Sequence, residues 1–457
     1  MRLAPANLER LPPDVERFGY DRARQKVGIV HFGIGAFHRA HQAWYTDAAM
    51  EAGEEDWMIS GVSLRSDTVL RQLAPQLGLY SITERSGSEA RTRIVGSVRE
   101  VLLATEGAKA IVARLASADS RVASLTVTEK GYCMAPAGGL DNALARRSFY
   151  PVLAAGLAAR MNSGLPGLTV LSCDNLSGNG TVLKRLILEW SAFENPDLAR
   201  WVEEHCRFPS SMVDRIVPAT TPDDLDLIEA KLGLRDEGAV LTERFSQWVI
   251  EDRFAGSRPA WEKHGAQFVA DVAPYETAKL RMLNGAHSLL AFCGLDRGYV
   301  FVHEAIADPG LRTLVDRLMR EEAATSFTPA QGQDLAAYAD ALIRRFADPA
   351  LQHRLMQIAM DGSQKIPPRW LATLAAHQRM GKRCPVILQG LAKWLRHVRG
   401  DLRAVDDPLA SKLAALWSSA GASGIGPALF GENGLFAAHW RADEEDLHAI
   451  EEALGEV

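Results

Sequence analysis

The segment from residue 27 to residue 42 constrains the fold more than any other part of this chain. It is an apolar, β-rich run that reaches Gly33-x-Gly35 and continues into a stretch compatible with a helix. A strand, a glycine turn and a helix start in this order are typical of a dinucleotide-binding βαβ unit, in which glycine lets the backbone approach a pyrophosphate. His38 stands where the pattern has its third glycine, so the pattern alone also fits an unrelated α/β protein.

The first part of the chain alternates strand-like and helix-like segments, which predicts a parallel sheet covered by helices. The strand-like segments are residues 28–32, 57–64, 122–128 and 168–171, and the helix-like segments are residues 108–116 and 150–161. A hairpin turn at residues 86–91 indicates antiparallel additions, and residues 247–252 and 267–271 are expected as late strands of this domain.

From residue 274 onward the pattern changes to amphipathic helices, at residues 311–323, 336–346, 349–360, 386–400 and 443–454. A chain of 457 residues also exceeds the size at which single cores stop growing. We therefore expect an α/β protein. A Rossmann-type dinucleotide-binding domain would cover residues 1–272, and a mostly α-helical domain for substrate and catalysis would cover residues 273–457.

A lysine, an asparagine and a histidine are grouped in the segment Lys279-Leu-Arg-Met-Leu-Asn284-Gly-Ala-His287. In a regular helix Asn284 and His287 are neighbours, and Lys279 lies about 80° around from His287. An amine, an amide and an imidazole together suit proton abstraction from an alcohol and stabilisation of the oxyanion. Taken alone, a motif this short is more often a solvated lysine, a helix-terminal asparagine and a packed histidine.

The strand expected at residues 57–64 ends in Arg65-Ser66-Asp67. At this point of a dinucleotide-binding unit an acid binds the ribose hydroxyls of NAD, whereas an arginine accepts the 2′-phosphate of NADP. The chain offers both, and Asp67 favours NAD over NADP.

Four motifs occur in a fixed order along the chain. They are Gly33-x-Gly35-x-Phe37-His38-Arg39-Ala40-His41-Gln42, Thr128-Glu129-Lys130-Gly131-Tyr132, Ser172-Cys173-Asp174-Asn175 and Lys279-x4-Asn284-x2-His287. In these motifs, and over residues 20–441, the chain closely resembles the mannitol dehydrogenase family of polyol-specific long-chain dehydrogenases. The segments 128–133 and 360–367 are most similar to its fructuronate reductase branch.

The resemblance implies a role for each group of residues. Lys279 would be the general base, Asn175 and Asn284 would hold the oxyanion and also contact the substrate, and His287 would bind a substrate hydroxyl. The cofactor would lie along Gly33, Gly35, Phe37, His38 and Arg39, where Arg39 could reach a phosphate. Glu129 and Lys130 would lie on a loop beside the nicotinamide, and Asp214 would border cofactor and substrate.

The resemblance also places Lys365 in the substrate pocket. Polyol-oxidising members carry an arginine eight residues earlier, where this chain has Gln357. We therefore expect an NAD-dependent oxidoreductase that interconverts a 2-keto sugar acid and its alcohol, fructuronate and D-mannonate being the first choice. The alternative is a mannitol 2-dehydrogenase or a related arabinitol or sorbitol dehydrogenase. A 6-phosphogluconate-type enzyme and a non-catalytic dinucleotide sensor are further rivals.

Composition narrows the remaining classes. The net charge of −6 gives no electrostatic reason to expect nucleic acid or an anionic membrane as a partner. Five scattered cysteines without a C-x-x-C pair favour a reducing cytoplasm. No metal is expected, since His31, His38 and His41 lack a completing carboxylate or cysteine. No stretch approaches the roughly 20 apolar residues of a membrane span. A monomer or small homo-oligomer is expected.

Overall fold

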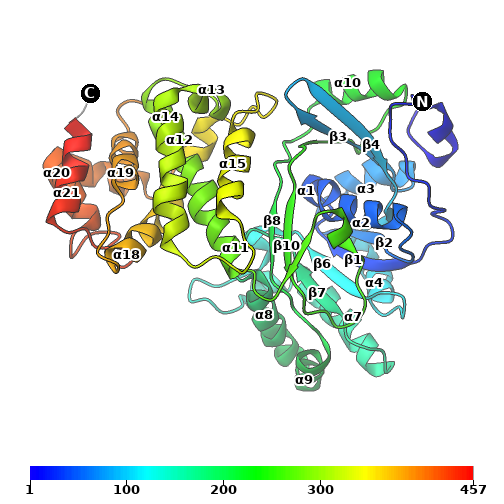
Figure 1. The fold of residues 1–457 in the computed structure, drawn as a ribbon. Coiled ribbons are helices and arrows are strands. Elements are labelled where there is room, and N and C mark those ends of the chain that lie inside the picture. The colour runs from blue at the N-terminus through cyan, green and yellow to red at the C-terminus, as the bar shows by residue number, and fades with distance from the viewer. Residues whose placement is uncertain (456–457) are drawn as a thin grey trace. The chain divides into compact units, whose positions relative to one another are not determined.

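The computed structural model describes residues 1–455. The chain forms two compact units, Met1–Val272 and Ala273–Val457 (Figure 1). The first is built of β-strands covered by helices. In the second, the described residues form helices and no strand longer than an isolated bridge. These architectures confirm the expected fold class.

The first unit is organised around a parallel sheet of five strands in the order β5-β2-β1-β6-β7. The strands are β1 (Val27–Phe32), β2 (Met58–Ser63), β5 (Val98–Leu103), β6 (Val122–Leu125) and β7 (Thr169–Ser172). From β1 the chain proceeds to β2 and β5 on one side and then returns to β6 and β7 on the other. The strand order therefore reverses between β1 and β6, and in open α/β sheets ligands bind outside the carboxyl ends of the strands at such a point.

Both faces of this sheet are covered, because side chains alternate along each strand. Ile29 of β1 packs in one core with Ala43 of α2, whereas its neighbour Val30 packs in a second core with Leu115 of α4 and Leu157 of α7. The covering helices are α2 (Gln42–Glu51), α4 (Ala104–Leu115), α7 (Tyr150–Asn162) and α8 (Asn179–Glu194). All six residues of β1 are buried, which explains why all of them except His31 are apolar or glycine.

Two three-stranded sheets complete this unit, in the orders β4-β3-β9 and β11-β10-β8. Their strands are β3 (Tyr80–Ser86), β4 (Glu89–Val95), β8 (Ser211–Asp214), β9 (Val240–Glu243), β10 (Gln247–Glu251) and β11 (Gln267–Val269). The expected hairpin is present, with Ser86 opposite Glu89. The expected late strands are also present, as β10 and β11, but together with β8 they form a separate sheet.

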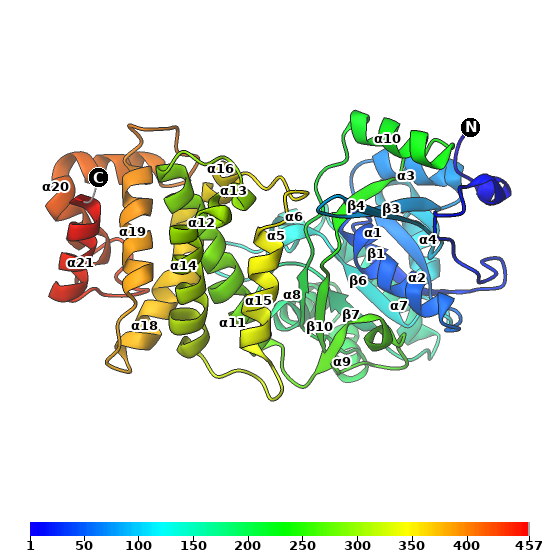
Figure 2. The ribbon, with the colours of Figure 1, turned by 45° about the horizontal axis from the view of Figure 1, so that its top comes forward.

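The second unit is arranged around α12 (Gly285–Asp296). Almost every residue of α12 is buried, as expected of a helix that is apolar on all sides. Helices α14 (Pro309–Arg317) and α19 (Pro385–Val398) contact it and run beside it in both views (Figure 2). Further helices are α15 (Leu335–Phe346), α16 (Leu355–Ala359), α17 (Gly362–Ile366), α20 (Ala410–Phe430) and α21 (Glu444–Gly455).

Three segments of this unit are π-helical, with hydrogen bonds that span one residue more than those of an α-helix. They are η4 (Lys279–Asn284), η5 (Leu318–Ala323) and η7 (Pro367–Leu371), and η4 contacts both of the others. The π turn is rare and is often found at functional sites.

One expected helix is only half formed. Residues 349–360 were expected to be helical throughout, but only α16 at their C-terminal end is. The preceding backbone instead bonds to a neighbouring segment, because Val302 donates to the carbonyl of His353 at 3.0 Å and Leu355 donates to the carbonyl of Val300 at 2.9 Å. These bonds occupy groups that a longer helix would need for itself.

Helix α20 corrects the expectation that no stretch approaches a membrane span. It is the one helix among residues 1–455 that is long and apolar enough by length and composition, and 33% of its apolar window is buried. Gly421 adopts φ 67° and ψ −173° inside it, which interrupts the helical backbone. Neither part on its own has the about 20 residues that a span requires.

Candidate functional site

The glycine turn follows β1 at the carboxyl edge of the parallel sheet. Gly33 has φ +96°, and a Cβ atom there would lie 2.0 Å from the carbonyl oxygen of Thr126, which follows β6. Only glycine fits such a position. At Gly35 a Cβ atom would meet nothing closer than 3.9 Å, so the backbone there faces open space. Helix α1 (Ala36–Ala40) then begins without a side-chain cap. These features fit the approach of a dinucleotide phosphate to the backbone.

His38 occupies the place of the third glycine and points into the protein. It is fully buried, and its ring stacks on that of His31 with the centroids 3.4 Å apart. The ring of His31 bonds to Ser124 Oγ at 2.8 Å and to Thr126 Oγ1 at 2.9 Å. Burial lowers the pKa of His31 to about 3 and holds the pKa of His38 well below its ordinary value. His38 therefore packs beneath the turn as a neutral ring.

Arg39 also turns inward, which corrects the expectation that it reaches a phosphate. Its Nε donates to the carbonyl of Gly35 at 3.3 Å and its Nη1 donates to the carbonyl of Gly238. These bonds hold the glycine turn against another part of the same unit. Phe37 is partly buried and stacks on His41, with ring centroids 5.0 Å apart. Arg39 and Phe37 thus shape the turn from inside.

Asp67 and Arg65 both follow β2, on the loop that leads into α3 (Thr68–Leu73). Arg65 is exposed, whereas one carboxylate oxygen of Asp67 pairs with Arg71 at 3.1 Å. Asp67 sits at the position before the helix, beside the strand next to β1. Both side chains remain available to discriminate between cofactors, and the choice of Asp67 stays a prediction.

The segment after β6 forms a short helix, α5 (Thr128–Gly131), where a loop was expected. Thr128 begins it with φ +63°, a left-handed conformation that is uncommon for threonine. Glu129 and Lys130 are both exposed at this carboxyl edge of the sheet. Their side chains are therefore placed where ligands bind in open α/β sheets.

Asp174 holds this unusual turn in place. Its carboxylate accepts from the backbone N–H groups of Val127 and Thr128, at 3.1 and 2.8 Å, and from the hydroxyl of Tyr132 at 3.0 Å. Burial raises the pKa of Asp174, while these donors act in the opposite direction. The carboxylate thus connects the end of β7 with the start of α5.

Asn175 and Asp214 follow the ends of two different strands. Asn175 is exposed just after β7, and Asp214 is buried at the end of β8. The side chain of Asn179 joins the two ends, because its Nδ2 donates to the carbonyls of Asp174 at 2.9 Å and Ser211 at 2.7 Å, and its Oδ1 accepts from the N–H of Ser211 at 2.9 Å. The structure therefore brings the segments of Asn175 and Asp214 together within the first unit.

The helical segment of Lys279 differs from the regular helix expected from the sequence. In an α-helix, Lys279 and Asn284 would lie about 140° apart, since five residues turn the chain by about 500°. The π-helix η4 begins at Lys279 and ends at Asn284, and its i→i+5 bonds bring residues five apart to nearly the same face. His287 follows on the next turn, in α12. By this turn angle, the π-helix brings Lys279 closer to the face of Asn284 and His287 than a regular α-helix of the same residues would.

His287 lies among basic and aromatic groups. Its ring is 4.8 Å from Phe346 and 5.3 Å from His353, measured between centroids. Burial holds the pKa of His287 well below its ordinary value, and the positive charges of Arg345 and Arg369 act in the same direction. The imidazole is therefore neutral near pH 7 and can exchange hydrogen bonds with a hydroxyl group.

Lys365 belongs to the same neighbourhood. Its Nζ donates to the carbonyl of Ile358 at 3.3 Å, and it contributes to the lowered pKa of His353. Burial lowers the pKa of Lys365, and Arg369 adds to that effect. In the second unit Lys365 therefore lies in the neighbourhood of His287 and His353. The sequence predicted a substrate-binding role for Lys365 and His287 but none for His353.

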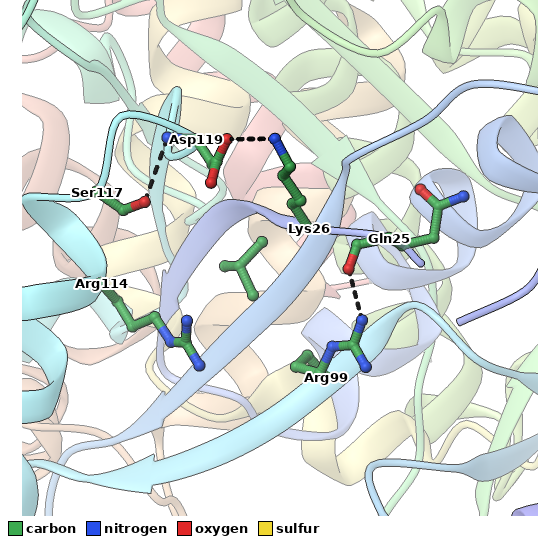
Figure 3. Close-up of a pocket in the computed structure, with 7 residues that line it drawn as sticks. Gln25, Lys26, Arg99, Arg114, Ser117 and Asp119 are labelled. Atoms are coloured by element: carbon green, nitrogen blue, oxygen red, sulfur yellow. Dashed lines mark hydrogen bonds and ion pairs between the residues drawn. The ribbon is translucent and has the colours of Figure 1, made fainter. Parts of the chain in front are cut away.

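A hollow elsewhere in the first unit is polar, and its cationic side chains are engaged by partners in the protein (Figure 3). It lies beside Val27, at the amino end of β1, and is lined by Lys26, Arg99 and Arg114. Lys26 pairs with Asp119 at 3.1 Å, Arg114 pairs with Glu100 at 2.6 Å, and Arg99 donates to the backbone carbonyl of Gln25 at 2.6 Å. Ligands of open α/β sheets bind at the opposite, carboxyl edge. This hollow is therefore not the cofactor site.

Among residues 1–455, no three histidine, cysteine or acidic side chains are grouped as a metal site. All five cysteines are free and buried.

Comparison with known proteins assigns the family. The mannitol dehydrogenase Rossmann domain matches residues 27–263, and the mannitol dehydrogenase C-terminal domain matches residues 271–454. The chain belongs to the mannitol dehydrogenase family. It is accordingly an oxidoreductase of that family.

Several members of the mannitol dehydrogenase family are similar to this chain over nearly its whole length. The D-mannonate oxidoreductase of Escherichia coli K12 is 41% identical over 93% of this chain and 91% of its own length. A mannitol 2-dehydrogenase of Aspergillus fumigatus is 36% identical over 96% of this chain and 92% of its own length. The solved structure of Pseudomonas fluorescens mannitol 2-dehydrogenase with NAD and D-mannitol has a TM-score of 0.82 at 34% identity, covering 100% of this chain and 96% of that one.

Three structural residues of this mannitol dehydrogenase chain have no role that could be assigned from the sequence. Asp174 and Asn179 arrange the loops at the sheet edge, and Arg369 donates to the carbonyl of Asn284. Asp174 lies inside one of the four family motifs, and this position is a signal that could have identified it. No comparable signal marks Arg369, because its partner lies 85 positions earlier in the chain.

Proposed function

We propose that this chain is an NAD-dependent oxidoreductase that interconverts a 2-keto sugar acid and its alcohol, with fructuronate and D-mannonate as the pair. The observation that supports the proposal is the π-helix η4, which begins at Lys279 and ends at Asn284, three residues before His287. The similarity to a D-mannonate oxidoreductase over nearly the full length supports the substrate class.

Each of these residues has one proposed role in the reaction. Lys279 takes the proton from the substrate hydroxyl during oxidation and returns it during reduction. A lysine acts as a base near neutral pH when burial and nearby cations lower its pKa. Asn175 and Asn284 supply amide donors for the developing oxyanion. His287, held neutral by its surroundings, binds another hydroxyl of the substrate. Bound NAD would supply the hydride acceptor.

The cofactor assignment rests on the first unit. The open backbone at Gly35 and the left-handed Gly33 fit a dinucleotide phosphate. Asp67 would accept hydrogen bonds from the ribose hydroxyls and repel a 2′-phosphate. NAD is bound by the solved mannitol 2-dehydrogenase of similar fold. Glu129, Lys130 and Asp214 are proposed to border the nicotinamide.

The preference for an acid substrate rests on the second unit. Lys365 lies in a basic neighbourhood with His353, and a carboxylate needs a cation or donors aimed at it. A mannitol 2-dehydrogenase or related polyol dehydrogenase is the second candidate, favoured by the relatives of that name. We further propose a cytoplasmic enzyme that is a monomer or small homo-oligomer, because free cysteines suit a reducing compartment.

Steady-state kinetics with a substrate panel test this proposal. The enzyme would be assayed with NADH and fructuronate or fructose, and with NAD and D-mannonate, mannitol, arabinitol or sorbitol. We expect the highest kcat/KM for fructuronate and D-mannonate. An equal or higher kcat/KM for fructose or mannitol would assign the chain to the polyol dehydrogenases.

A further inference from the structure

Arg369 contacts the proposed catalytic segment, the π-helix η4. It belongs to the π-helix η7, and its Nη1 donates to Ser288 Oγ at 2.9 Å and to the carbonyl of Asn284 at 3.3 Å. One edge of the guanidinium is therefore fixed against η4 and α12. The other edge, formed by Nε and Nη2, has no acceptor among residues 1–455, although the side chain is partly exposed.

The positive charge of Arg369 has no carboxylate partner among residues 1–455. Among the residues that the structure describes, no carboxylate forms an ion pair with it, and burial alone lowers its pKa to about 10. Taking a cation out of water without a partner is unfavourable, so buried charges are normally paired. The partly exposed guanidinium of Arg369 is therefore suited to bind an anion from solution.

The position of Arg369 relative to Lys365 and His287 indicates which anion. Arg369 follows Lys365 by four residues, in the continuous helical run of α17 and η7. The positive charge of Arg369 acts on both Lys365 and His287. It therefore lies within electrostatic reach of the proposed carboxylate-binding lysine and of the proposed hydroxyl-binding histidine.

We propose that Arg369 binds the carboxylate of the sugar-acid substrate together with Lys365, through its Nε and Nη2 edge. This inference rests on the proposed function and assigns it a specificity-determining residue. A guanidinium edge matches the two oxygens of a carboxylate with parallel hydrogen bonds, whereas an ammonium group acts as a point charge. A neutral ketose or alditol has no group that would use this edge in the same way.

Two substitutions at this position and one matched control test the inference. Arg369→Gln removes the charge, and Arg369→Lys keeps it but removes the planar edge. Arg403→Gln is the control, because Arg403 is also a partly exposed arginine of the second unit and its Nη2 donates to a backbone carbonyl, that of Leu295, at 2.9 Å. The readout is kcat/KM for fructuronate and for fructose in each variant.

We expect Arg369→Gln to lower kcat/KM for fructuronate by about a hundredfold while the value for fructose changes only a few-fold, since a charged hydrogen-bonding partner is lost for one substrate only. Arg369→Lys should lose about tenfold for the acid. Arg403→Gln should leave the ratio of the kcat/KM values for the two substrates as in the parent. If Arg369→Gln does not fold, the ratio in Arg369→Lys decides.

The outcomes separate the inference from the function on which it rests. A parent enzyme without preference for fructuronate overturns both. A parent with that preference, and Arg369 variants that keep it, overturns the inference alone. Equal losses for both substrates show that Arg369 only supports η4. A changed ratio in Arg403→Gln but not in the Arg369 variants also overturns the inference, because Arg369 would then not be the residue that discriminates.

Discussion

The carboxylate of Asp174 accepts the backbone N–H of Thr128 at 2.8 Å and so bridges the ends of two parallel strands. Thr128 has a left-handed backbone, and the exposed Glu129 and Lys130 follow it. A side chain that is buried at the end of β7 therefore sets the direction of a segment that starts at the end of β6. The function of Asp174 is to position this segment.

We expect Asp174→Ala to lower the free energy of unfolding by about 1–3 kcal/mol, because buried N–H groups lose their acceptor. The KM for NADH should rise, since the turn that carries Glu129 and Lys130 is released. Denaturant unfolding and NADH-dependent kinetics measure the two effects. Asp174→Asn, which keeps an acceptor oxygen, should fall between the parent and the alanine variant. A parental KM in the alanine variant would show that the turn holds itself.

Lys279→Ala should reduce kcat by about 10²–10⁴-fold while NADH binding is retained, which is the usual contribution of general-base catalysis. Lys382→Ala serves as the control, because Lys382 is exposed in the same unit. Turnover is measured at saturating substrate, and NADH affinity is measured by fluorescence titration. A Lys279 variant that stays within about tenfold of the parent would remove this lysine from the role of base.

Cofactor selection should favour NADH over NADPH, because Asp67 repels a 2′-phosphate. Asp67→Ala is expected to narrow the difference in kcat/KM between the two cofactors, and Arg65→Ala to widen it. Both variants are compared with each cofactor at fixed substrate. A parent enzyme that uses NADPH as well as or better than NADH contradicts the assignment.

Lys365→Met should lower kcat/KM for fructuronate about a hundredfold more than for fructose, as expected when a charged partner is lost. Methionine keeps most of the apolar stem, so the change isolates the charge. Lys412→Met provides a comparison at an exposed site of the same unit. Similar losses for both substrates would mean that Lys365 supports the fold of α17 instead of binding an acid.

The stability of the second unit should depend on the protonation of Glu322. Its buried carboxylate accepts the N–H groups of Val386 and Ile387 at 2.8 and 3.0 Å, where α19 begins. Burial raises the pKa of Glu322 from 4.5 to about 7. The folded chain then holds a proton that the unfolded chain releases, so this contribution is complete below pH 4.5 and is lost as the pH rises to about 7.

The loss amounts to up to about 3 kcal/mol, because each pKa unit corresponds to about 1.4 kcal/mol. Glu322→Gln should remove this dependence, since an amide keeps the acceptor but does not titrate. Free energies of unfolding at several pH values between 4.5 and 8 are compared for the two proteins. If the unfolding free energies of the two proteins changed in parallel over this pH window, Glu322 would be excluded as the cause of the pH dependence.

The turn at Gly33 could be predicted from the sequence because it requires a particular residue type. A left-handed conformation next to the carbonyl of Thr126 admits only glycine, and glycine is visible in the sequence. His38 was recognised as a departure from the glycine pattern, but its stacking on His31 was not foreseen, because that contact depends on how α1 packs on β1. The inward turn of Arg39 has the same origin.

The helical register at Lys279 could not be predicted. Residue type and spacing indicate a helix there, but an α turn and a π turn differ by one hydrogen-bonding step, and packing with η5 and η7 accompanies the π form. The same limit explains residues 349–360, where His353 accepts from Val302 and Leu355 donates to Val300, so that bonds to a distant segment replace part of the expected helix. Periodicity describes a segment alone and contains no information on such neighbours.

At the π turn between Lys279 and Asn284, a more stable helix would be a less active one. A helix in which the same residues closed with regular α-helical bonds would lose only the poorer geometry of the wider turn. In that regular helix Lys279 would lie about 140° from Asn284. Substitutions selected for a more stable helix would thus separate the two side chains that turnover requires, and screens for thermostable variants should avoid this stretch.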